Sequence, residues 1–352
     1  MRLLWVLPLL VEAHNKSFMQ HCAKECDCQE ELSANCTQAS LTHLPRPLPP
    51  QTELLDLSHN QLTHLPRRAF IYTRHLKTLM LNDNNISSVA DGAFSPLESL
   101  MRLDLSRNRL AALGTGFTLG MGALRELVLA ENQLTALDSH SFQHLDSLLR
   151  LNLSHNHIHL VQVRAFGCLS TLRQLHLDGN RLPSLGNGVF TMLKSLEVLQ
   201  LRGNNISHID IDTLTPLTSL ALLDLARNRL SGVHFKTFLS LQTYSTHILL
   251  RRNPWQCDCD LQRVFRKLRS VRRLLLDDYD SLSCAEPAEL RGYLINQVAD
   301  ELCVAEMVTV LIITVTVLVT VVAAILMAER KRKRRSREKH WTDGASQVSY
   351  DS

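Results

Sequence analysis

The sequence is poor in aromatic residues and has almost no excess of charge of either sign. Phe, Trp and Tyr make up 5% of the 352 residues, although hydrophobic residues make up 45%. This composition argues against a large globular core filled with aromatic side chains. The formal net charge of +4 is too small, over this length, for a nucleic-acid-binding surface. The apolar residues must be organised in another way, and their spacing shows how.

Asparagine recurs at a constant interval along most of the chain, and leucine surrounds it in a constant frame. The frame reads L-x-x-L-x-L-x-x-N-x-L, and one copy is filled by Leu76, Leu79, Leu81, Asn84 and Ile86. Eight copies in register indicate a repeat architecture rather than a series of globular domains. The eight evenly spaced asparagines are Asn60, Asn84, Asn108, Asn132, Asn156, Asn180, Asn204 and Asn228.

Each L-x-L segment predicts a short strand whose leucines point into the core while the residue between them points outward. The stacked strands predict a parallel sheet, and buried asparagines at the turns can satisfy neighbouring backbone groups. One coil cannot bury its own apolar side, so only stacking closes the core. A second ladder is predicted on the convex side, with Leu214 replacing one phenylalanine. Its members are Phe70, Phe94, Phe117 (one residue early), Phe142, Phe166, Phe190 and Phe238.

Eight of the nine cysteines form two clusters that flank the repeats. In a chain with export signals, four cysteines at each end indicate disulfides rather than zinc ligands. The sequence alone allows three pairings in each cluster, and a metal site at Cys257 and Cys259 is the less favoured alternative. The clusters are Cys22, Cys26, Cys28 and Cys36, and Cys257, Cys259, Cys284 and Cys303.

The repeats and both cysteine clusters resemble the extracellular leucine-rich repeat family. The resemblance covers residues 51–250 and, with the flanking caps, about 22–303; its most specific segment is N-P-W-Q-C-D-C at 253–259. It implies an α/β fold, a curved horseshoe of parallel strands closed by disulfide caps. It also implies the disulfide pairs Cys22–Cys28, Cys26–Cys36, Cys257–Cys284 and Cys259–Cys303.

Two apolar segments predict how the chain meets the membrane. The run at 3–11 is too short to span a bilayer and predicts a signal peptide cleaved after Ala13. The uncharged run at 307–328 predicts a transmembrane helix, and the basic residues after it predict a single-pass type I plasma-membrane protein with an extracellular N-terminus. The predicted domains are signal peptide 1–13, N-terminal cap 14–50, repeats 51–250 (eight complete copies of the period plus a terminal partial repeat), C-terminal cap 251–306, transmembrane helix 307–328 and cytoplasmic tail 329–352.

Positive charge is concentrated on both sides of the predicted membrane helix. Residues 251–273 hold eight Lys or Arg against two Asp, which predicts either a solvated cap helix or contact with acidic lipid, glycan or a partner. On the cytoplasmic side, a basic cluster predicts stop-transfer and contact with anionic lipid, with a retention signal or channel contact as the alternative. This cluster consists of Arg330, Lys331, Arg332, Lys333, Arg334 and Arg335.

Two features predict possible routes to oligomerisation. Cys168 belongs to neither cluster and occupies a slot on the convex return of its repeat, which predicts a half-buried free thiol or, alternatively, an intermolecular disulfide. Thr316, Thr320 and Ala324 recur at every fourth position in the membrane segment. Such a small-residue face permits close helix packing, although ordinary β-branched filler is the alternative.

Five N-x-S/T sequons predict N-linked glycosylation at Asn15, Asn35, Asn85, Asn152 and Asn205. Asn15 is very close to the proposed cleavage point. Asn152 lies between two core leucines and is predicted to point out of the concave sheet. A glycan there would obstruct the usual binding face, so either this sequon is unused or the partner binds elsewhere.

The outward positions of the strands carry the candidate partner-binding residues. Neighbouring repeats present Arg102, Glu126 and Arg150 side by side, an alternating-charge stripe suited to recognition, with a merely solvated sheet face as the alternative. Asp104 and His176 lie in the next outward row. The sequence shows no nucleophile–base pair and no aligned carboxylate pair, so no catalytic, cofactor or metal site is predicted.

Two patterns imitate ligand sites without predicting one. Gly114, Gly116 and Gly120 resemble a phosphate-binding loop, but they fall on the convex return of a repeat. Three alternating histidines within residues 155–159 leave a zinc or pH-sensitive site as the alternative to ordinary surface histidines.

The sequence therefore predicts a non-enzymatic cell-surface recognition, adhesion or co-receptor protein that binds an extracellular or membrane protein. With a tail as short as 329–352, any signal must pass through a partner or through clustering. The alternative is an auxiliary membrane subunit acting in cis. Residues 304–306 alone separate the last cap cysteine from the membrane helix, and this feature, the single helix and the polybasic inner end are similar to the auxiliary gamma subunits of large-conductance potassium channels.

Overall fold

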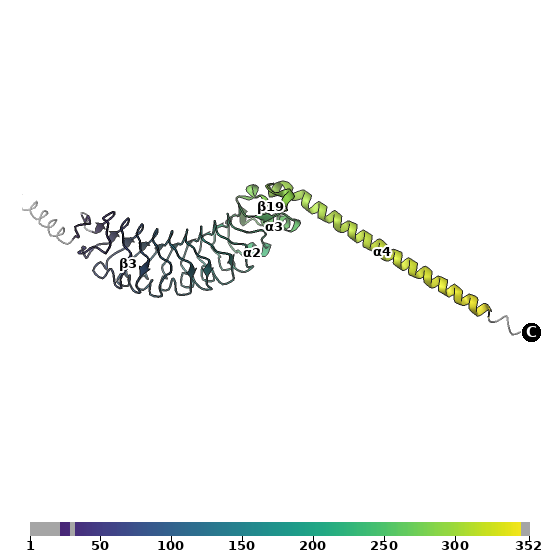
Figure 1. Cartoon of the computed structure of the whole chain (residues 1–352), viewed down its shortest axis with the longest axis horizontal. Coiled ribbons are helices and arrows are strands. Elements are labelled where there is room, and N and C mark those ends of the chain that lie inside the picture. The colour runs from purple at the N-terminus through teal and green to yellow at the C-terminus, as the bar shows by residue number, and fades with distance from the viewer. Residues whose placement is uncertain (1–21, 29–31, 346–352) are drawn as a thin grey trace, which may run out of the picture. The chain divides into compact units, whose positions relative to one another are not determined.

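A computed structural model describes residues 22–28 and 32–345 of the chain; the predicted signal peptide and Asn15 lie outside the described residues. Contacts divide the chain into two compact units, one ending at Asn296 and one beginning at Gln297. In the first unit, the repeats are coils stacked side by side in a curved row (Figure 1).

A parallel sheet of eleven strands runs through every coil of this row. Its strands are short because in most coils three residues are extended before the chain turns toward the asparagine: the residue before the L-x-L segment and the first two residues of that segment. In spatial order they are β1 (Ser33–Asn35), β2 (Leu54–Asp56), β4 (Thr78–Met80), β6 (Arg102–Asp104), β7 (Glu126–Val128), β9 (Arg150–Asn152), β11 (Gln174–His176), β13 (Val198–Gln200), β15 (Leu222–Asp224), β16 (Thr246–Leu249) and β18 (Leu274–Leu276).

The register of this sheet follows the sequence period. Leu55 is paired with Leu79, and Leu79 with Leu103, so equivalent positions of successive repeats are direct neighbours. The central leucine of each strand from β2 to β15 is completely buried. The predicted curved parallel-sheet solenoid is therefore confirmed, and its outward rows are straight lines of equivalent positions.

The asparagines form a buried ladder that ties each coil to the one before it. Asn156 accepts a hydrogen bond from the backbone N–H of Leu134 at 3.0 Å and donates to the carbonyls of Leu129 at 2.9 Å and Leu153 at 3.1 Å. The same pattern continues through Asn253, which comes one position later than the period would place it after Asn228. The ladder thus has a ninth rung, which closes the terminal partial repeat against the cap.

The predicted phenylalanine ladder fills the convex side of the core. Phe70 and Phe94 stack with ring centroids 5.9 Å apart, but Phe117 meets Phe94 edge-on at 5.7 Å. The glycines before Phe117 have a packing role: the Asp91 carboxylate accepts a hydrogen bond from the Gly116 N–H at 3.1 Å, and the Asp91 side chain lies close against Gly114 and Gly116. This contact accounts for two of the three glycines that imitate a phosphate-binding loop.

Short elements complete the coils and the C-terminal cap. Three two-stranded parallel ladders lie behind the main sheet: β3 (His64–Leu65) with β5 (Ser88–Val89), β8 (Ala136–Leu137) with β10 (Leu160–Val161), and β12 (Ser184–Leu185) with β14 (His208–Ile209). The remaining elements are α2 (Phe235–Leu239), β17 (Trp255–Gln256) paired with β19 (Cys284–Glu286), α3 (Cys259–Ser270), η1 (Tyr279–Ser281), η2 (Ala288–Leu290) and α4 (Ile295–Ala345).

The C-terminal cap covers the end of the core with aromatic side chains. Trp255 is completely buried and meets Phe265 of α3 edge-on at 5.4 Å, and Phe265 meets Tyr279 at 5.8 Å. Helix α3 begins after Asp258, whose carboxylate accepts a hydrogen bond from the Leu261 N–H at 2.7 Å, an N-cap interaction. An aromatic cluster that includes the buried Trp255 thus closes the core where the solenoid ends.

Three disulfides have the pairing that the family resemblance implies: Cys22–Cys28 and Cys26–Cys36 in the N-terminal cap, and Cys257–Cys284 in the C-terminal cap. The implied pair Cys259–Cys303 stays a prediction. Cys168 is a free thiol, but it is exposed, so the expectation of a half-buried side chain is wrong. On the convex return, Phe166 and Leu169 take the buried positions, and the side chain of Cys168 faces solvent.

Helix α4 contains the segment Val308–Arg335, which among the described residues is the one helix long and apolar enough to cross a membrane. On the predicted small-residue face, the Thr316 and Thr320 hydroxyls donate to the carbonyls of Ile313 and Val317, each at 2.8 Å. Both hydroxyls are therefore satisfied within their own helix, which leaves a small and effectively apolar face.

The ladder gives a direct test of what holds the coils together. We expect Asn132→Ala to lower the free energy of unfolding by about 2–4 kcal/mol, because the buried N–H of Leu110 loses its partner and the carbonyl of Leu105 keeps only its bond from Asn108. In calorimetry of the full chain in detergent, this loss corresponds to a fall in Tm of roughly 5–15 °C. The adjacent exposed substitution Gln133→Ala is the control; equal Tm values for the two variants would contradict the role of the ladder.

Candidate protein-binding surface

Three charged side chains lie in a row across the middle of the sheet, on β6, β7 and β9. The register pairs Arg102 with Glu126 and Glu126 with Arg150. Arg102 Nη1 donates to Glu126 Oε2 at 2.7 Å, and Arg150 Nη1 lies 4.0 Å from the same oxygen. The structure thus brings together the three residues predicted for the alternating-charge stripe. Arg150, 59% exposed, is the most accessible of the three side chains.

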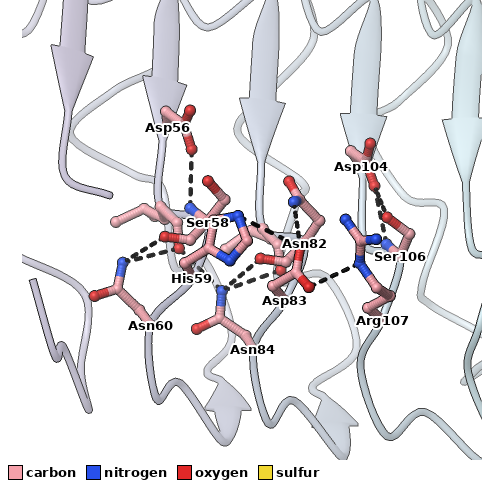
Figure 2. A network of polar contacts seen from close by, with 12 residues as sticks. Asp56, Ser58, His59, Asn60, Asn82, Asp83, Asn84, Asp104, Ser106 and Arg107 are labelled. Carbon is pink, nitrogen blue, oxygen red and sulfur yellow. Dashed lines mark hydrogen bonds and ion pairs between the residues drawn. The ribbon is translucent and has the colours of Figure 1, made fainter. Parts of the chain in front are cut away.

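Asp104 stands in the next outward row but is not available to a partner. Only 8% of it is exposed, and its Oδ1 accepts hydrogen bonds from the Ser106 N–H at 2.9 Å and the Ser106 hydroxyl at 2.6 Å. The carboxylate therefore folds back to close the turn after its own strand, as Asp56 does with the Ser58 N–H (Figure 2). The expectation that Asp104 presents its side chain outward is wrong for this reason.

The same strand ending was visible in the sequence as a recurrent D-x-S or N-x-S. It occurs at 56–58, 104–106 and 152–154, and its first residue is in each case the last residue of a strand. An acidic or amide side chain two residues before a serine forms a local turn of this kind. This spacing could have marked Asp104 as a structural residue.

His176 lies on β11 and is paired across the sheet with Gln200 rather than with the charged stripe. Its Nδ1 is 3.0 Å from Gln200 Oε1. In the register of the sheet its neighbour on the other side is Asn152 of β9. His176 is half-buried and contributes a polar position beside the stripe, and among the described residues no group of three or more His, Cys, Asp or Glu side chains could hold a metal ion.

The sequons occupy different surfaces of the solenoid. Asn35, Asn85 and Asn205 are exposed, and the last two directly follow ladder asparagines. Asn152 is half-buried on the sheet face, where its Oδ1 accepts hydrogen bonds from the Ser154 N–H at 3.0 Å and hydroxyl at 2.7 Å. The serine of this sequon is therefore bonded to the asparagine itself. Glycosylation at each of these positions stays a prediction.

A second charged row, which was not predicted from the sequence, runs along the side of the sheet where the C-terminal ends of the strands lie. We call this side the edge of the sheet. The row consists of the residue immediately before each ladder asparagine, and every member has a left-handed backbone with φ between 52° and 70°. In the first five repeats acidic residues alternate with histidine or arginine along this row. The row reads His59, Asp83, Arg107, Glu131, His155, Gly179, Gly203, Arg227 and Arg252.

Asp83 is the centre of this edge network (Figure 2). Arg107 Nε donates to Asp83 Oδ1 at 2.7 Å, Asn82 donates to Asp83 Oδ2 at 2.8 Å, and His59 Nε2 lies 3.7 Å from the same oxygen. Burial raises the pKa of Asp83, but the hydrogen bonds from Asn82 and Arg107 and the charges of Arg107 and His59 outweigh it, so the pKa lies below its ordinary value. The hydrogen bond to Asp83 likewise raises the pKa of Arg107.

Comparison with known proteins places the repeats in a family. The leucine rich repeat family matches residues 50–110, 98–158, 122–182 and 170–230, which together span slightly more than half of the chain. The chain belongs to the leucine-rich repeat family.

Individual relatives match shorter stretches. Leucine-rich repeat-containing protein 3B of cattle and of human is 39% identical over 75 residues, which cover 21% of this chain and 29% of the relative. Leucine-rich repeat-containing G-protein coupled receptor 5 of Xenopus tropicalis is 34% identical over 97 residues, which cover 27% of this chain and 11% of the receptor. The chain thus spans less than a third of the length of these relatives.

Solved structures match more of the chain. Human 5T4 (Wnt-activated inhibitory factor 1, trophoblast glycoprotein) is 28% identical, with a TM-score of 0.60 over 78% of this chain and 95% of the other. The repeat protein in an octameric complex of Latrophilin 3, Unc5D and FLRT2 is 23% identical, with a TM-score of 0.58 over 78% and 97%, and shows the shared fold. With the disulfides and the apolar helix, these relatives indicate a membrane-anchored extracellular protein that resembles receptors and binding proteins.

The edge network predicts a pH-dependent contribution to stability. Because the pKa of Asp83 is lowered in the folded chain, its ion pairs stabilise the fold above its ordinary pKa and are lost as the pH falls through the folded value. We expect Asp83→Asn to lower Tm at pH 7 by roughly 1–4 °C, a small effect because Arg107 is half exposed. The difference from the parent chain is expected to shrink as the pH falls below the ordinary pKa of an aspartate and through the folded value.

Glu98→Gln supplies the control for this measurement, since Glu98 is exposed and its side chain has no hydrogen bond or ion pair with any residue that the structure describes. Thermal unfolding of the three chains between pH 7 and pH 3 gives the comparison. A difference between Asp83→Asn and the parent chain that stays constant with pH would contradict the lowered pKa.

Proposed function

We propose that the chain is a non-enzymatic recognition protein of the plasma membrane and that its repeat ectodomain binds a protein partner. The observation that carries this proposal is the row of Arg102, Glu126 and Arg150 on three adjacent strands. Alternating charges at fixed spacing select the register and orientation of a partner. Because the strands are rigid, their side chains bind with little loss of backbone freedom.

Arg150 is the member of the row that we assign to partner contact. Arg102 donates a 2.7 Å hydrogen bond to Glu126. Arg150 lies 4.0 Å from the same carboxylate and has the more exposed side chain. A carboxylate of the partner can therefore pair with the Arg150 guanidinium without breaking the Arg102–Glu126 bond. Planar guanidinium groups are suited to such two-point contacts with carboxylates.

The membrane arrangement supports a role at the cell surface. We propose that residues 307–328 cross the plasma membrane with the caps and repeats (14–306) outside and the tail (329–352) inside, because basic residues follow the apolar segment directly. The described basic residues of the tail, Arg330–Arg335, are all exposed. This position favours contact with anionic lipid of the inner leaflet, which co-flotation with phosphatidylserine vesicles measures.

The test of the recognition surface uses the full chain in lipid nanodiscs, screened against purified ectodomains of cell-surface proteins. For an ectodomain that binds, we expect Arg150→Gln to weaken binding by at least about tenfold, or 1.4 kcal/mol, through loss of one charge-assisted contact. Surface plasmon resonance gives the affinities.

The control is Arg67→Gln, which removes an exposed arginine of equal charge from the segment behind the sheet. It is expected to leave the affinity within twofold. The proposal fails if no ectodomain binds, or if every ectodomain that binds does so equally well to Arg150→Gln and Arg67→Gln.

An auxiliary subunit acting in cis on a membrane protein is the second candidate, favoured by the small apolar face of Thr316, Thr320 and Ala324. With both hydroxyls bonded to their own helix, this face can pack closely against a neighbouring helix. Replacing 307–328 by an unrelated apolar helix is then expected to abolish co-purification of the membrane partner from detergent. A partner retained after the exchange would exclude the cis role and leave the ectodomain as the binding element.

We also propose that two copies of the chain associate. The exposed Cys168 thiol is accessible to a second chain, and the small-residue face offers a contact that needs no covalent bond. Non-reducing electrophoresis of the parent chain and Cys168→Ser distinguishes the two routes.

A further inference from the structure

Four arginines gather at the edge of the sheet in the last three coils before the C-terminal cap. Each coil contributes the two residues that precede its ladder asparagine: Arg202-Gly203, Ala226-Arg227 and Arg251-Arg252. Backbone hydrogen bonds hold the three pairs side by side. The Gly203 N–H donates to the Ala226 carbonyl at 3.0 Å, and the Arg227 N–H donates to the Arg251 carbonyl at 2.9 Å. The arginine cluster (Arg202, Arg227, Arg251 and Arg252) therefore forms two short parallel rows.

The cluster has no close ion pair, in contrast to the earlier part of the same edge, although the Asp224 carboxylate acts on Arg202 and Arg251 from a longer distance. In the first repeats Arg107 is paired with Asp83 at 2.7 Å, but no arginine of the cluster has a side-chain hydrogen bond or ion pair with any residue that the structure describes. The neighbouring carboxylates serve the backbone: Asp224 accepts from the Ala226 N–H at 2.9 Å, and Asp278 from the Arg251 N–H at 2.7 Å.

The arginines also repel one another. The charges of Arg252, Arg202 and Arg251 lower the pKa of Arg227 from its ordinary value. Like charges held this close by the backbone attract a ligand that carries several negative groups. A single carboxylate or phosphate would satisfy only part of the cluster.

The cluster itself is open and contains no large apolar side chain. Arg227, Arg251 and Arg252 are exposed, and Arg202 is half-buried. Gly203 has φ of +70°, and its Cβ position meets only the backbone of Gly179, so bare main chain lies beside Arg202 and Arg227. Protein interfaces of high affinity are centred on buried aromatic and apolar anchors, and none of the exposed large hydrophobic residues belongs to these three pairs.

We propose that the arginine cluster binds a linear sulfated polysaccharide. Neighbouring coils are about 4.8 Å apart, so the arginines offer charge at steps of roughly 5 and 10 Å along the edge. An extended chain with a sulfate on successive sugars can follow this edge and receive forked hydrogen bonds from each guanidinium. Such a chain needs no apolar pocket. The site lies on the coils of β13, β15 and β16, apart from the stripe on β6, β7 and β9, so this inference does not rest on the proposed protein partner.

The experiment measures the affinity of a size-defined heparin oligosaccharide for the full chain in nanodiscs at 0.15 M NaCl. Every chain keeps its own tail, and nanodiscs that carry residues 307–352 alone give the binding of the tail, which is subtracted. Arg227→Gln with Arg252→Gln is expected to weaken binding by at least about tenfold, because two charge-assisted contacts are lost. Binding to the unsubstituted ectodomain is expected to weaken as salt is raised.

Arg67→Gln with Arg68→Gln is the matched control. It removes the same charge from exposed positions behind the sheet, and Arg68 has the same left-handed backbone as Arg227, with φ of 52° and 55°. This variant is expected to bind within twofold of the parent chain, and equal Tm values for both double variants exclude unfolding as the cause of a loss.

Three results would overturn the proposal. The first is an affinity for heparin that is the same in the cluster variant and the control. The second is equal binding of fully desulfated heparin, which would show that sulfate is not recognised. The third is a polyglutamate peptide of equal charge that binds as tightly with the same dependence on Arg227 and Arg252, which would assign the cluster to an acidic protein segment instead.

Discussion

The buried asparagine ladder is the interaction on which the rest of the structure depends. Each amide bonds backbone groups of two coils, so it fixes where one coil lies on the next and where the chain turns after each strand. The two residues before each asparagine are consequently held in straight rows along the edge of the sheet, with the second of them in a left-handed conformation. Both the Asp83 network and the arginine cluster are products of this constraint.

The strand face and the edge of the solenoid differ in their pattern of charge. The strands present the alternating charges of Arg102, Glu126 and Arg150, where pairing across the sheet holds each side chain in place. The edge changes along its length, from paired acid and base around Asp83 to unpaired arginines beside the cap. Two neighbouring surfaces with different charge patterns are suited to different ligands, one with mixed charge and one with negative charge alone.

The period of leucine and asparagine was sufficient to predict the strands, their register and the row that contains Arg102, Glu126 and Arg150. It was not sufficient for Asp104, because a period indicates which face a residue occupies but not whether its side chain bends back to its own turn. Cys168 was misplaced for a related reason, since a slot on an irregular return does not fix burial. The edge row was missed because its residues occupy a variable position of the frame, and their common feature is a backbone angle that the sequence does not display.

Glycopeptide mass spectrometry of the chain purified from a secretory host tests the central claim, that an extracellular sheet face is open to a partner, most directly. Asn152 lies on that face beside the Arg150 stripe, whereas Asn85 and Asn205 lie on the opposite side of the asparagine ladder. The account predicts glycans at Asn85 and Asn205, as an extracellular ectodomain requires, and an unmodified Asn152. A glycan at Asn152 would contradict recognition through the sheet face, and a chain without any glycan would contradict the extracellular position of the repeats.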